Sequence, residues 1–402
     1  MTEPVDVLVA GAGPAGTVAA TLLARAGASV RLVDRARFPR DKLCGDTLNP
    51  GALAALRQLA LAPPGLARGL RLEGMRVSGS GVSVDCRYPR GLYGVAILRR
   101  DLDQGLLEIA CAAGVQFEER VSVRRAILEG GPRRPRVAGL VVAPADGRSG
   151  ETPMRARVTI AADGRRSTLA FGLGLARHPA APRRWAVGGY FDGVAGLSSL
   201  GEMHIRGGYY LGMAPVPGGL TNVCLVASPG GGTAFDRRFG DPVDLLRTAM
   251  AIDPAIALRC AAARPAGRPV VLGPLAVDVR AAAIDGLLLA GDAAGFIDPM
   301  TGDGLGFAIR GGELAARAAV EALSSGWDGV HRRLAARRRR RFAAKRGFNR
   351  SLRTIVGSPA AVQAAAWGVM LAPSALRFVI RIAGDTWAAG DAVCGPAARE
   401  AW

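Results

Sequence analysis

The first 34 residues constrain the fold more than any other stretch of the sequence. An apolar run from Val5 to Ala10 enters a glycine-rich turn at residues 11–16, and a second apolar run from Ser29 to Val33 ends at Asp34. This order predicts a strand, a tight turn, a helix, and a second strand that ends in an acid. Two strands joined in this way by a helix form the dinucleotide-binding unit of doubly wound α/β folds.

The glycines and the acid of this unit each have a physical role in binding a dinucleotide. Gly11 permits the tight turn, Gly13 lets the backbone approach a pyrophosphate, and Gly16 lets the helix pack on the strand. The helix N-terminus presents free N–H groups to the phosphates, and Asp34 is placed to accept hydrogen bonds from a ribose. NAD and FAD both bind to this unit, so later residues must decide between them.

A later apolar strand, Leu287 to Ala290, leads into a motif that favours FAD. It delivers the carboxylate of Asp292, and the loop 298–306, which contains proline and glycine, begins a helix predicted from Phe307 to Leu323. Free N–H groups at a helix N-terminus favour negative charge. A reduced flavin carries such charge on its pyrimidine end, whereas a nicotinamide needs no such loop.

Two further loops are expected close to the glycine turn. One predicted strand ends in Asp-Gly-x-x-Ser at residues 163–167, which places polar groups at the sheet edge where α/β folds bind ligands. The segment 35–46 leaves the ribose-side strand and contains Cys44, with Arg40 and Lys42 nearby. Cys44 is either a redox or nucleophilic residue activated by these cations, or a small residue buried under the loop.

Other strands are predicted outside the parallel sheet. Alternating residues from Leu70 to Val84 predict a hairpin, and residues 126–158 are typical of a β-meander. The strands in residues 185–226 cannot all join the parallel sheet, so we expect an antiparallel sheet whose inner face covers a substrate pocket. Its aromatic residues are otherwise ordinary core. The predicted pocket residues are Tyr190, Tyr209, Tyr210, Met213 and Pro215.

The chain of 402 residues is long enough for two domains, or for one domain with a large insert. We predict a discontinuous FAD-binding domain, a β-rich domain that covers the substrate, and a basic, alanine-rich helical segment at the C-terminus. The predicted bounds are 1–80, 95–180 and 270–325 for the first, 81–94 and 181–269 for the second, and 326–402 for the third.

The formal net charge of +19 is compatible with nucleic acid, an anionic membrane or an acidic substrate, but we favour coding bias as its source. The six cysteines form no C-x-x-C motif and no paired spacing with the three histidines, so we expect no metal site and no disulfide framework. Glu3 and Asp6 stand where a signal peptide would carry basic residues. We therefore expect a cytoplasmic protein.

The segment from Arg332 to Arg353 is densely basic, and no acid occurs between Asp328 and Asp385. We expect this helix on the surface, where a solvated face is the default and a peripheral contact with phospholipid headgroups or an acidic carrier protein is the alternative. No aromatic residues interleave with the arginines as in a nucleic-acid platform, so nucleic acid is not the expected partner. The uncharged stretch 354–376 is divided by Pro359 and Pro373, which predicts a docked or interfacial helix rather than a membrane span.

Four motifs together resemble the FAD oxidoreductases of the glutathione reductase type. They are Gly11 to Gly16 with Asp34, the Lys-Leu-Cys-Gly-Asp segment at 42–46, the Asp-Gly-x-x-Ser element at 163–167, and residues 291–306. Within that group they look like the branch of geranylgeranyl reductases, flavin-dependent halogenases and UbiH-like aromatic hydroxylases. The resemblance covers roughly residues 1–325 and implies an α/β, Rossmann-like FAD-binding fold with an antiparallel substrate sheet.

The resemblance also implies non-covalent FAD and assigns residues to it. Asp34 would lie at the adenosine ribose, Arg99 near the flavin, Asp163 and Gly164 by the pyrophosphate, and Asp292 by the ribityl chain. The full set of implied cofactor residues is Gly11, Gly13, Pro14, Ala15, Gly16, Asp34, Arg35, Cys44, Gly45, Arg99, Asp163, Gly164, Gly291, Asp292, Pro299, Gly302, Gly304 and Leu305.

The sequence departs from two members of that branch. The hydroxylases usually carry an arginine where this chain has Ala170, and often a histidine where it has Gly295. The halogenases carry a Trp-x-Trp-x-Ile-Pro motif, and residues 210–215 lack both tryptophans. The Cys-Gly-Asp segment and the loop 298–304 look closest to geranylgeranyl reductases and their bacterial relatives.

Two enzymatic functions and one other class follow from these observations. The first is an NAD(P)H-dependent FAD monooxygenase acting on an apolar phenolic, quinone-like, polyketide or isoprenoid lipid substrate, with no evident catalytic base. The second is a reductase that saturates isoprenoid double bonds, with Cys44 as its catalytic residue. The remote alternative is a non-catalytic protein that binds FAD or nucleic acid.

Overall fold

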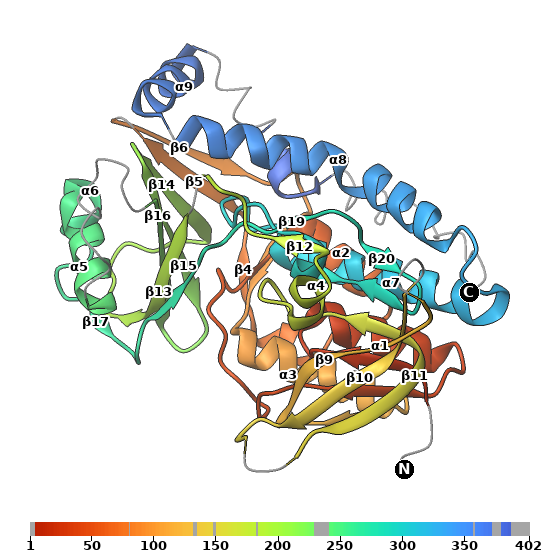
Figure 1. The fold of residues 1–402 in the computed structure, drawn as a ribbon. Helices are drawn as coiled ribbons and strands as arrows, with labels where there is room; N and C mark the ends of the chain where they lie inside the picture. Colours follow the sequence, from red (N-terminus) through yellow and green to blue (C-terminus); the bar gives the residue numbers. More distant parts are fainter. Residues whose placement is uncertain are drawn as a thin grey trace.

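Three parts of the chain are distinct in the computed structural model: a mixed sheet with its helices, a second sheet, and a pair of C-terminal helices (Figure 1). The structure describes residues 5–79, 81–131, 135–147, 150–181, 184–228, 241–356, 358–371 and 379–386.

The first sheet contains the N-terminal unit that the sequence predicted. Its strands are β1 (Val5–Ala10), β2 (Val30–Val33), β8 (Gln116–Glu118), β9 (Val121–Glu129), β10 (Arg136–Pro144), β11 (Thr152–Ala161), β20 (Ala283–Ile284) and β21 (Leu287–Leu289). The order is β20-β21-β11-β1-β2-β8, with parallel pairing from β21 to β8. The first half of β11 pairs with β10, and β10 pairs with β9, which gives the expected β-meander.

The alternation of side chains along β1 explains why both faces of this sheet are buried. Val7 and Val9 face a core formed with helices, while Leu8 and Ala10 face a second core formed with the meander. All four are fully buried. A parallel sheet needs cover on both faces, and here the meander supplies one cover while helices supply the other.

The helices that cover the first sheet begin with sequence signals for helix capping. Pro14 and Pro50 occupy first-turn positions, and the Asn49 side chain accepts a hydrogen bond from the Ala52 N–H. The helices of this part are α1 (Pro14–Arg25), α2 (Pro50–Gln58), α3 (Arg99–Ala112), α4 (Thr168–Gly172) and α7 (Gly304–Ser325), with short 3₁₀ turns η1 (Pro64–Arg68) and η2 (Gly291–Ala294).

The second sheet has the order β17-β13-β16-β15-β14-β5-β6, with β18 also paired to β13. Its strands are β5 (Gly74–Gly79), β6 (Val82–Arg87), β13 (Trp185–Asp192), β14 (Leu200–Arg206), β15 (Tyr209–Val216), β16 (Leu220–Ala227), β17 (Arg264–Pro265) and β18 (Val270–Leu272). Helices α5 (Pro242–Ile252) and α6 (Pro254–Ala257) pack on one face. The predicted β5–β6 hairpin is confirmed, but the sheet takes in residues 74–79 and 270–272, which we had placed in the FAD-binding domain.

Two small sheets join these larger parts. One has the order β3-β7-β4 and connects the segment after β2 to the strand before α3. The other pairs β12 with β19. Their bounds are β3 (Thr47–Leu48), β4 (Leu70–Leu72), β7 (Gly94–Ala96), β12 (Ala176–Arg177) and β19 (Asp278–Val279).

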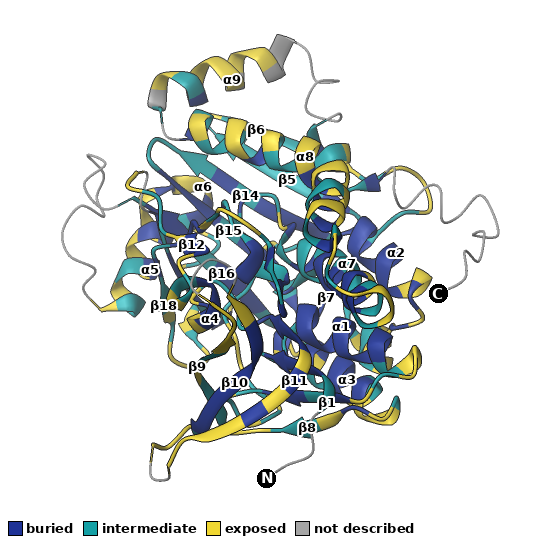
Figure 2. Cartoon of the chain, turned by 45° about the vertical axis from the view of Figure 1, so that its right-hand side comes forward, coloured by how far each residue is buried: buried dark blue, intermediate teal, exposed yellow. Residues whose placement is uncertain are grey.

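The C-terminal helices α8 (Val330–Val356) and α9 (Pro359–Leu371) lie along the outer edge of the molecule (Figures 1 and 2). Figure 2 shows that α8 has a buried side and an exposed side. Residues 379–386 return to the first part, where the Gly51 N–H donates to the Gly384 carbonyl. Among the described residues, we find no helix that is long and apolar enough to cross a bilayer.

Helix α7 packs closely on α1 because glycines remove side chains at the contact. A Cβ atom placed on Gly312 would lie 2.4 Å from the Ala15 carbonyl oxygen, and one on Gly291 would lie 2.8 Å from the Ala15 Cβ. Backbone atoms cannot move aside without shifting a whole element. This contact fixes the distance between the glycine turn and the loop that precedes α7.

We therefore expect Gly312→Ala to lower the free energy of unfolding by roughly 1 to 3 kcal/mol through overpacking. Gly306→Ala in the same helix is the matched control, because its Cβ would find its nearest neighbour at 3.9 Å. That control should be neutral or slightly stabilising, since alanine favours helix over glycine. Urea unfolding followed by circular dichroism measures both changes, and equal stability of the two variants would contradict the packing argument.

Candidate functional site

The glycine turn after β1 is held by two backbone contacts and is open at its centre. Gly11 has φ +100°, and a Cβ there would lie 2.5 Å from the Ala162 carbonyl oxygen. A Cβ on Gly16 would lie 1.8 Å from the Gly11 carbonyl oxygen. At Gly13 the nearest atom is Arg40 Nη2, at 3.5 Å, and no backbone atom approaches. The structure therefore leaves space only at the glycine that we predicted to face a pyrophosphate.

Asp34 lies at the end of β2 beside this turn. Its two carboxylate oxygens accept hydrogen bonds from the N–H groups of Ala12 and Ala36, each at 2.8 Å. The acid thus fixes the turn and the loop that follows β2. Its expected contact with a ribose stays a prediction, and the neighbouring Arg35 is exposed.

Cationic side chains surround the open side of the turn. Arg40 forms an ion pair with Asp103 at 3.2 Å, and the buried Arg99 binds both oxygens of the same carboxylate at 3.0 and 2.8 Å. Burial opposes the charge of Arg99, but Asp103 raises its pKa above the ordinary value. Lys42 lies across the turn, with its Nζ atom 3.9 Å from a Cβ placed on Gly164.

The residues present fit a dinucleotide diphosphate. The turn at Gly13 supplies backbone N–H groups, and Arg40 and Lys42 supply positive charge. Asp163 Oδ2 accepts the Thr168 N–H at 2.9 Å, whereas its Oδ1 atom is buried without a hydrogen-bond partner in the described part of the chain. Burial raises the pKa of Asp163 to about 6. An unsatisfied buried acceptor next to this cradle is suited to a hydroxyl group of a ligand.

Asp292 is the residue at which the predicted motifs converge. It lies in η2 at the end of β21; its carbonyl oxygen accepts the Gly295 N–H at 3.0 Å, whereas its carboxylate accepts no hydrogen bond from the residues that the structure describes. Burial raises the pKa of Asp292, while Lys42, Arg99 and Arg165 oppose this shift. These three cations come from the loop after β2, from α3 and from the 163–167 element, so the fold gathers them around one carboxylate.

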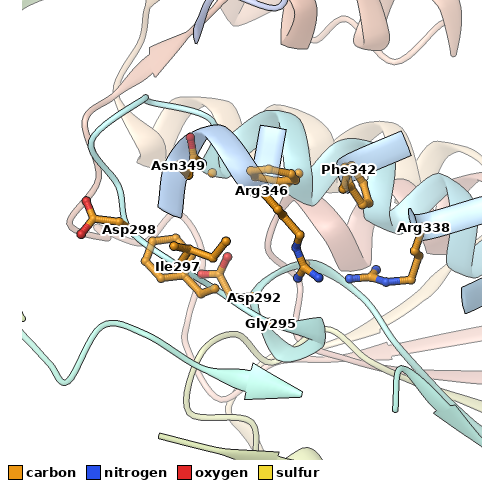
Figure 3. Close-up of a pocket in the computed structure, with 12 residues that line it drawn as sticks. Asp292, Gly295, Ile297, Asp298, Arg338, Phe342, Arg346 and Asn349 are labelled. Atoms are coloured by element: carbon orange, nitrogen blue, oxygen red, sulfur yellow. The ribbon is translucent and has the colours of Figure 1, made fainter. Parts of the chain in front are cut away.

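A small cavity lies behind η2, under α8 (Figure 3). Its volume is about 20 Å³, which is enough for roughly one water molecule. Arg338 and Arg346 extend from α8 toward η2 and both donate to the Ala294 carbonyl oxygen, at 2.9 and 3.3 Å. A Cβ on Gly295 would lie 2.7 Å from Arg346 Nη2. Gly295, at the position where the hydroxylases often carry a histidine, therefore leaves room for the Arg346 side chain.

The inner face of α8 also holds the loop that precedes α7. Lys345 Nζ lies 2.6 Å from Asp303 Oδ1, and the Thr301 hydroxyl lies 2.9 Å from Asn349 Oδ1. Burial lowers the pKa of Arg338 to about 10. The expectation that the basic segment 332–353 is a surface helix is thus only half right, because one face of it is part of the site.

Cys44 belongs to a buried polar cluster. Asp46 is fully buried, and its Oδ2 atom accepts hydrogen bonds from the Tyr190 hydroxyl at 2.8 Å and from Asn222 Nδ2 at 2.6 Å. The Asn222 amide also donates to the Cys44 carbonyl at 2.7 Å. Burial raises the pKa of Asp46 to about 6, although its hydrogen bonds oppose the shift.

This cluster faces the loop predicted to contact the flavin. Cβ atoms placed on Gly45 and on Gly302 would each lie 3.8 Å from the Thr47 hydroxyl oxygen. In that loop Gly302 has φ +65° and is exposed, Pro299 is half-buried, and Gly304 and Leu305 begin α7. The segment that ends at Thr47 therefore lies against the loop at Gly302.

A second buried carboxylate, Asp298, ties the same loop to the second sheet. The Tyr210 hydroxyl donates to its Oδ1 atom at 2.6 Å, and Arg184 Nη1 donates to its Oδ2 atom at 3.0 Å. Burial raises the pKa of Tyr210 well above its ordinary value. Tyr210 is therefore a fixed donor in this structure.

Three predicted pocket residues lie on the face of the second sheet that packs against helices, opposite the face of Tyr210. Side chains alternate along β15, so Tyr209 and Met213 pack in the core beneath α5 and α6, whereas Tyr210 packs with Met300 and Val356 on the opposite face. By the same alternation, the side chain of Pro215 lies on the same face as that of Tyr209. Of the predicted set, only Tyr190 and Tyr210 bond to the carboxylates described above.

The sequence analysis did not assign Asp46 or Asn222 to the site. The Cys-Gly-Asp segment was visible, but the donors to Asp46 lie 144 and 176 residues away along the chain. A polar Thr221–Asn222 pair within the otherwise apolar strand β16 was the available signal for Asn222.

Comparison with known proteins identifies the class. Residues 4–217 match the family described as an FAD binding domain, and the chain belongs to this family of FAD-dependent oxidoreductases. It is 33% identical over 333 residues to a menaquinone reductase of Mycobacterium tuberculosis, which covers 78% of this chain and 76% of that protein. It is 30% identical over 326 residues to digeranylgeranylglycerophospholipid reductase 1 of Methanopyrus kandleri, which covers 79% and 81%.

Solved structures share the fold at lower sequence identity. A geranylgeranyl bacteriochlorophyll reductase-like protein from Thermoplasma acidophilum has a TM-score of 0.74 and 22% identity, and covers 97% of this chain and 96% of that chain. The halogenase PltM in complex with phloroglucinol and FAD has a TM-score of 0.73 and 19% identity, and covers 97% and 84%. These likenesses confirm the predicted α/β FAD-binding fold.

We expect Gly13→Val to give folded protein without flavin absorbance, because its side chain fills the open centre of the turn without meeting backbone. Gly16→Val is the contrasting variant, since its side chain overlaps the Gly11 carbonyl and should unfold the unit. Far-ultraviolet circular dichroism and visible absorbance of the purified proteins separate the two effects. Retained flavin in folded Gly13→Val protein would place the diphosphate elsewhere.

The raised pKa of Asp46 predicts a pH dependence of stability in the FAD-free protein. The pKa of this carboxyl rises from its ordinary 3.8 to about 6, so the folded state binds the proton more tightly. The resulting stabilisation is complete below about pH 4 and is lost as the pH rises toward 6, by roughly 2 to 3 kcal/mol. Asp46→Asn should reduce this fall, measured by urea unfolding at several pH values. An unchanged pH slope in the variant would show that Asp46 does not titrate in this range.

Proposed function

We propose that the protein is an FAD-dependent reductase that saturates carbon–carbon double bonds in the isoprenoid chain of a lipid. This places our second expectation ahead of the monooxygenase. The observation that carries the proposal is the Cys44 cluster, in which Asp46 and Tyr190 are held in the segment that ends at Thr47, and Thr47 lies against Gly302 of the loop expected to hold the flavin. The names of two relatives, which are reductases of menaquinone and of a geranylgeranyl lipid, support it.

FAD, when bound, supplies the two-electron chemistry of such a reaction, and NAD(P)H is the electron donor that we propose for it. The protein would hold the diphosphate at Gly13 with Arg40 and Lys42, and the ribityl region at Asp292. The first turn of α7 offers its free backbone N–H groups to the pyrimidine end.

The proton that completes saturation must come from the protein or from water. We assign this step to the Cys44 thiol, whose backbone is held by the Asn222 amide on the Cys44 carbonyl. Asp46 accepts hydrogen bonds from the Asn222 amide and from the Tyr190 hydroxyl. Asp46 and Tyr190 are therefore positioning residues for Asn222 and for the segment that carries Cys44. After donation, the thiolate would be reprotonated from solvent.

One glycine leaves space on the face of the second sheet that carries Cys224. The neighbouring positions of β13 and β15 there are Gly188 and Gly212, and Leu43 occupies the space above Gly188, where a Cβ would lie 2.5 Å from Leu43 Cδ1. A Cβ on Gly212 would meet its nearest atoms only at 3.8 Å. Glycines in a strand interior often mark a place where another group approaches the backbone.

We expect Cys44→Ser to retain FAD and its reduction by the electron donor, but to lose product formation on a prenyl lipid by on the order of 100-fold. A serine hydroxyl is a far weaker acid than a thiol, while the change in volume is small. Cys111→Ser is the matched control, because Cys111 is a free, exposed cysteine on α3.

Anaerobic turnover with mass analysis of geranylgeranyl lipids, menaquinones and lipophilic phenols measures this effect. Saturated product formed without oxygen supports the reductase. Oxygenated product formed only in air, with Cys44→Ser as active as the wild type, would restore the monooxygenase.

A further inference from the structure

The outer face of α8 carries arginines that have no acid to pair with. Arg332, Arg339, Arg340 and Arg350 are exposed and form no ion pair with any residue in the described ranges. Other arginines of the helix are used internally: Arg333 and Arg337 bind Glu321, and the inner ones hold η2. Because α8 contains no acidic residue, nothing on the helix itself neutralises the outer face.

Three of these arginines form a line along the helix. Arg332, Arg339 and Arg350 are separated by seven and eleven residues, which is close to two and three turns of an α-helix. At 1.5 Å per residue the line is about 27 Å long. Arg340 lies beside it on the same exposed side. A straight row of guanidinium groups of this length matches a flat anionic surface.

Helix α9 adds an apolar element at the C-terminal end of α8 (Figure 1). It packs against α8, contains no charged residue, and leaves Trp367 60% exposed. Its sequence is apolar on all sides, yet it is too short to cross a bilayer. Exposed tryptophan and apolar surface beside arginines are the composition of helices that lie in the headgroup region of membranes.

We infer that the outer face of α8 together with α9 docks the protein on the surface of an anionic phospholipid bilayer. A bilayer has both groups that this surface would bind. Its lipid phosphates pair with the row of arginines, and the apolar region beneath the phosphates accommodates Trp367. The inference rests on the proposed function in one respect: docking on a bilayer would give the enzyme access to its lipid substrate. The inner face of the same helix holds η2 and the loop before α7, so docking lies one helix away from the site.

The test is co-sedimentation of the full-length, FAD-loaded protein with vesicles. We expect binding to mixed phosphatidylglycerol and phosphatidylcholine vesicles, little binding to phosphatidylcholine alone, and a loss of binding between about 50 and 300 mM NaCl. The triple variant Arg332→Gln/Arg339→Gln/Arg350→Gln should weaken binding by on the order of 100-fold. Trp367→Ala should weaken it several-fold and leave its salt dependence intact.

The matched control removes the same charge elsewhere. Arg100, Arg124 and Arg136 are exposed, form no ion pair with the described residues, and lie on α3, β9 and β10, away from α8 and α9 (Figure 1). The variant Arg100→Gln/Arg124→Gln/Arg136→Gln should bind vesicles like the wild type. Equal losses in the two triple variants would mean that only net charge matters, and would overturn the inference.

Two other outcomes also overturn it. One is no binding to anionic vesicles, and the other is salt-dependent binding to an acidic carrier protein that the α8 variant abolishes while vesicle binding is unchanged. Activity on detergent-solubilised prenyl lipid is measured separately. Activity without vesicle binding refutes only the docking surface, and vesicle binding without reductase activity refutes only the proposed function.

Discussion

The structure depends on the close contact of three backbone segments around the first turn of α1. Gly16 lies against Gly11, Gly11 lies against the end of β11 at Ala162, and Gly312 of α7 lies against Ala15. Each contact is too close for any side chain. Because these segments cannot separate, the ends of β1, β11 and β21 stay at one edge of the sheet. The loops that follow those strands, with Asp163 and Asp292, therefore face the same space.

The charges at this edge are balanced by residues from distant parts of the chain. Asp103 binds both Arg40 and Arg99, which leaves Lys42 and Arg165 near Asp292. Asp292 is half-buried among these cations, and its carboxylate has no hydrogen-bond donor among the described residues, so a ligand can complete it. The electrostatics of the site therefore agree with the FAD-binding family to which the chain belongs.

Helix α8 connects the site to the surface because its two faces carry different arginines. Arg338 is buried and bonds to a carbonyl of η2, whereas Arg339, one residue later, is exposed and has no partner among the described residues. Composition alone treats these residues as equivalent. Helical geometry separates them by 100° and gives one a structural role and the other a free charge.

The sequence by itself determined the dinucleotide-binding unit and the strand-to-helix loop, because both depend on local patterns: apolar runs, glycines at fixed spacing, and an acid at a strand end. Adjacent residues of a strand point to opposite faces, so Tyr209 and Tyr210 cannot line the same pocket. Our pocket prediction did not apply this rule. Only the tertiary structure decided that Asp46, in the loop before β3, meets Tyr190 and Asn222, which pair across β13 and β16 of the second sheet. Pairing between strands far apart in sequence sets such contacts, and no local propensity encodes that register.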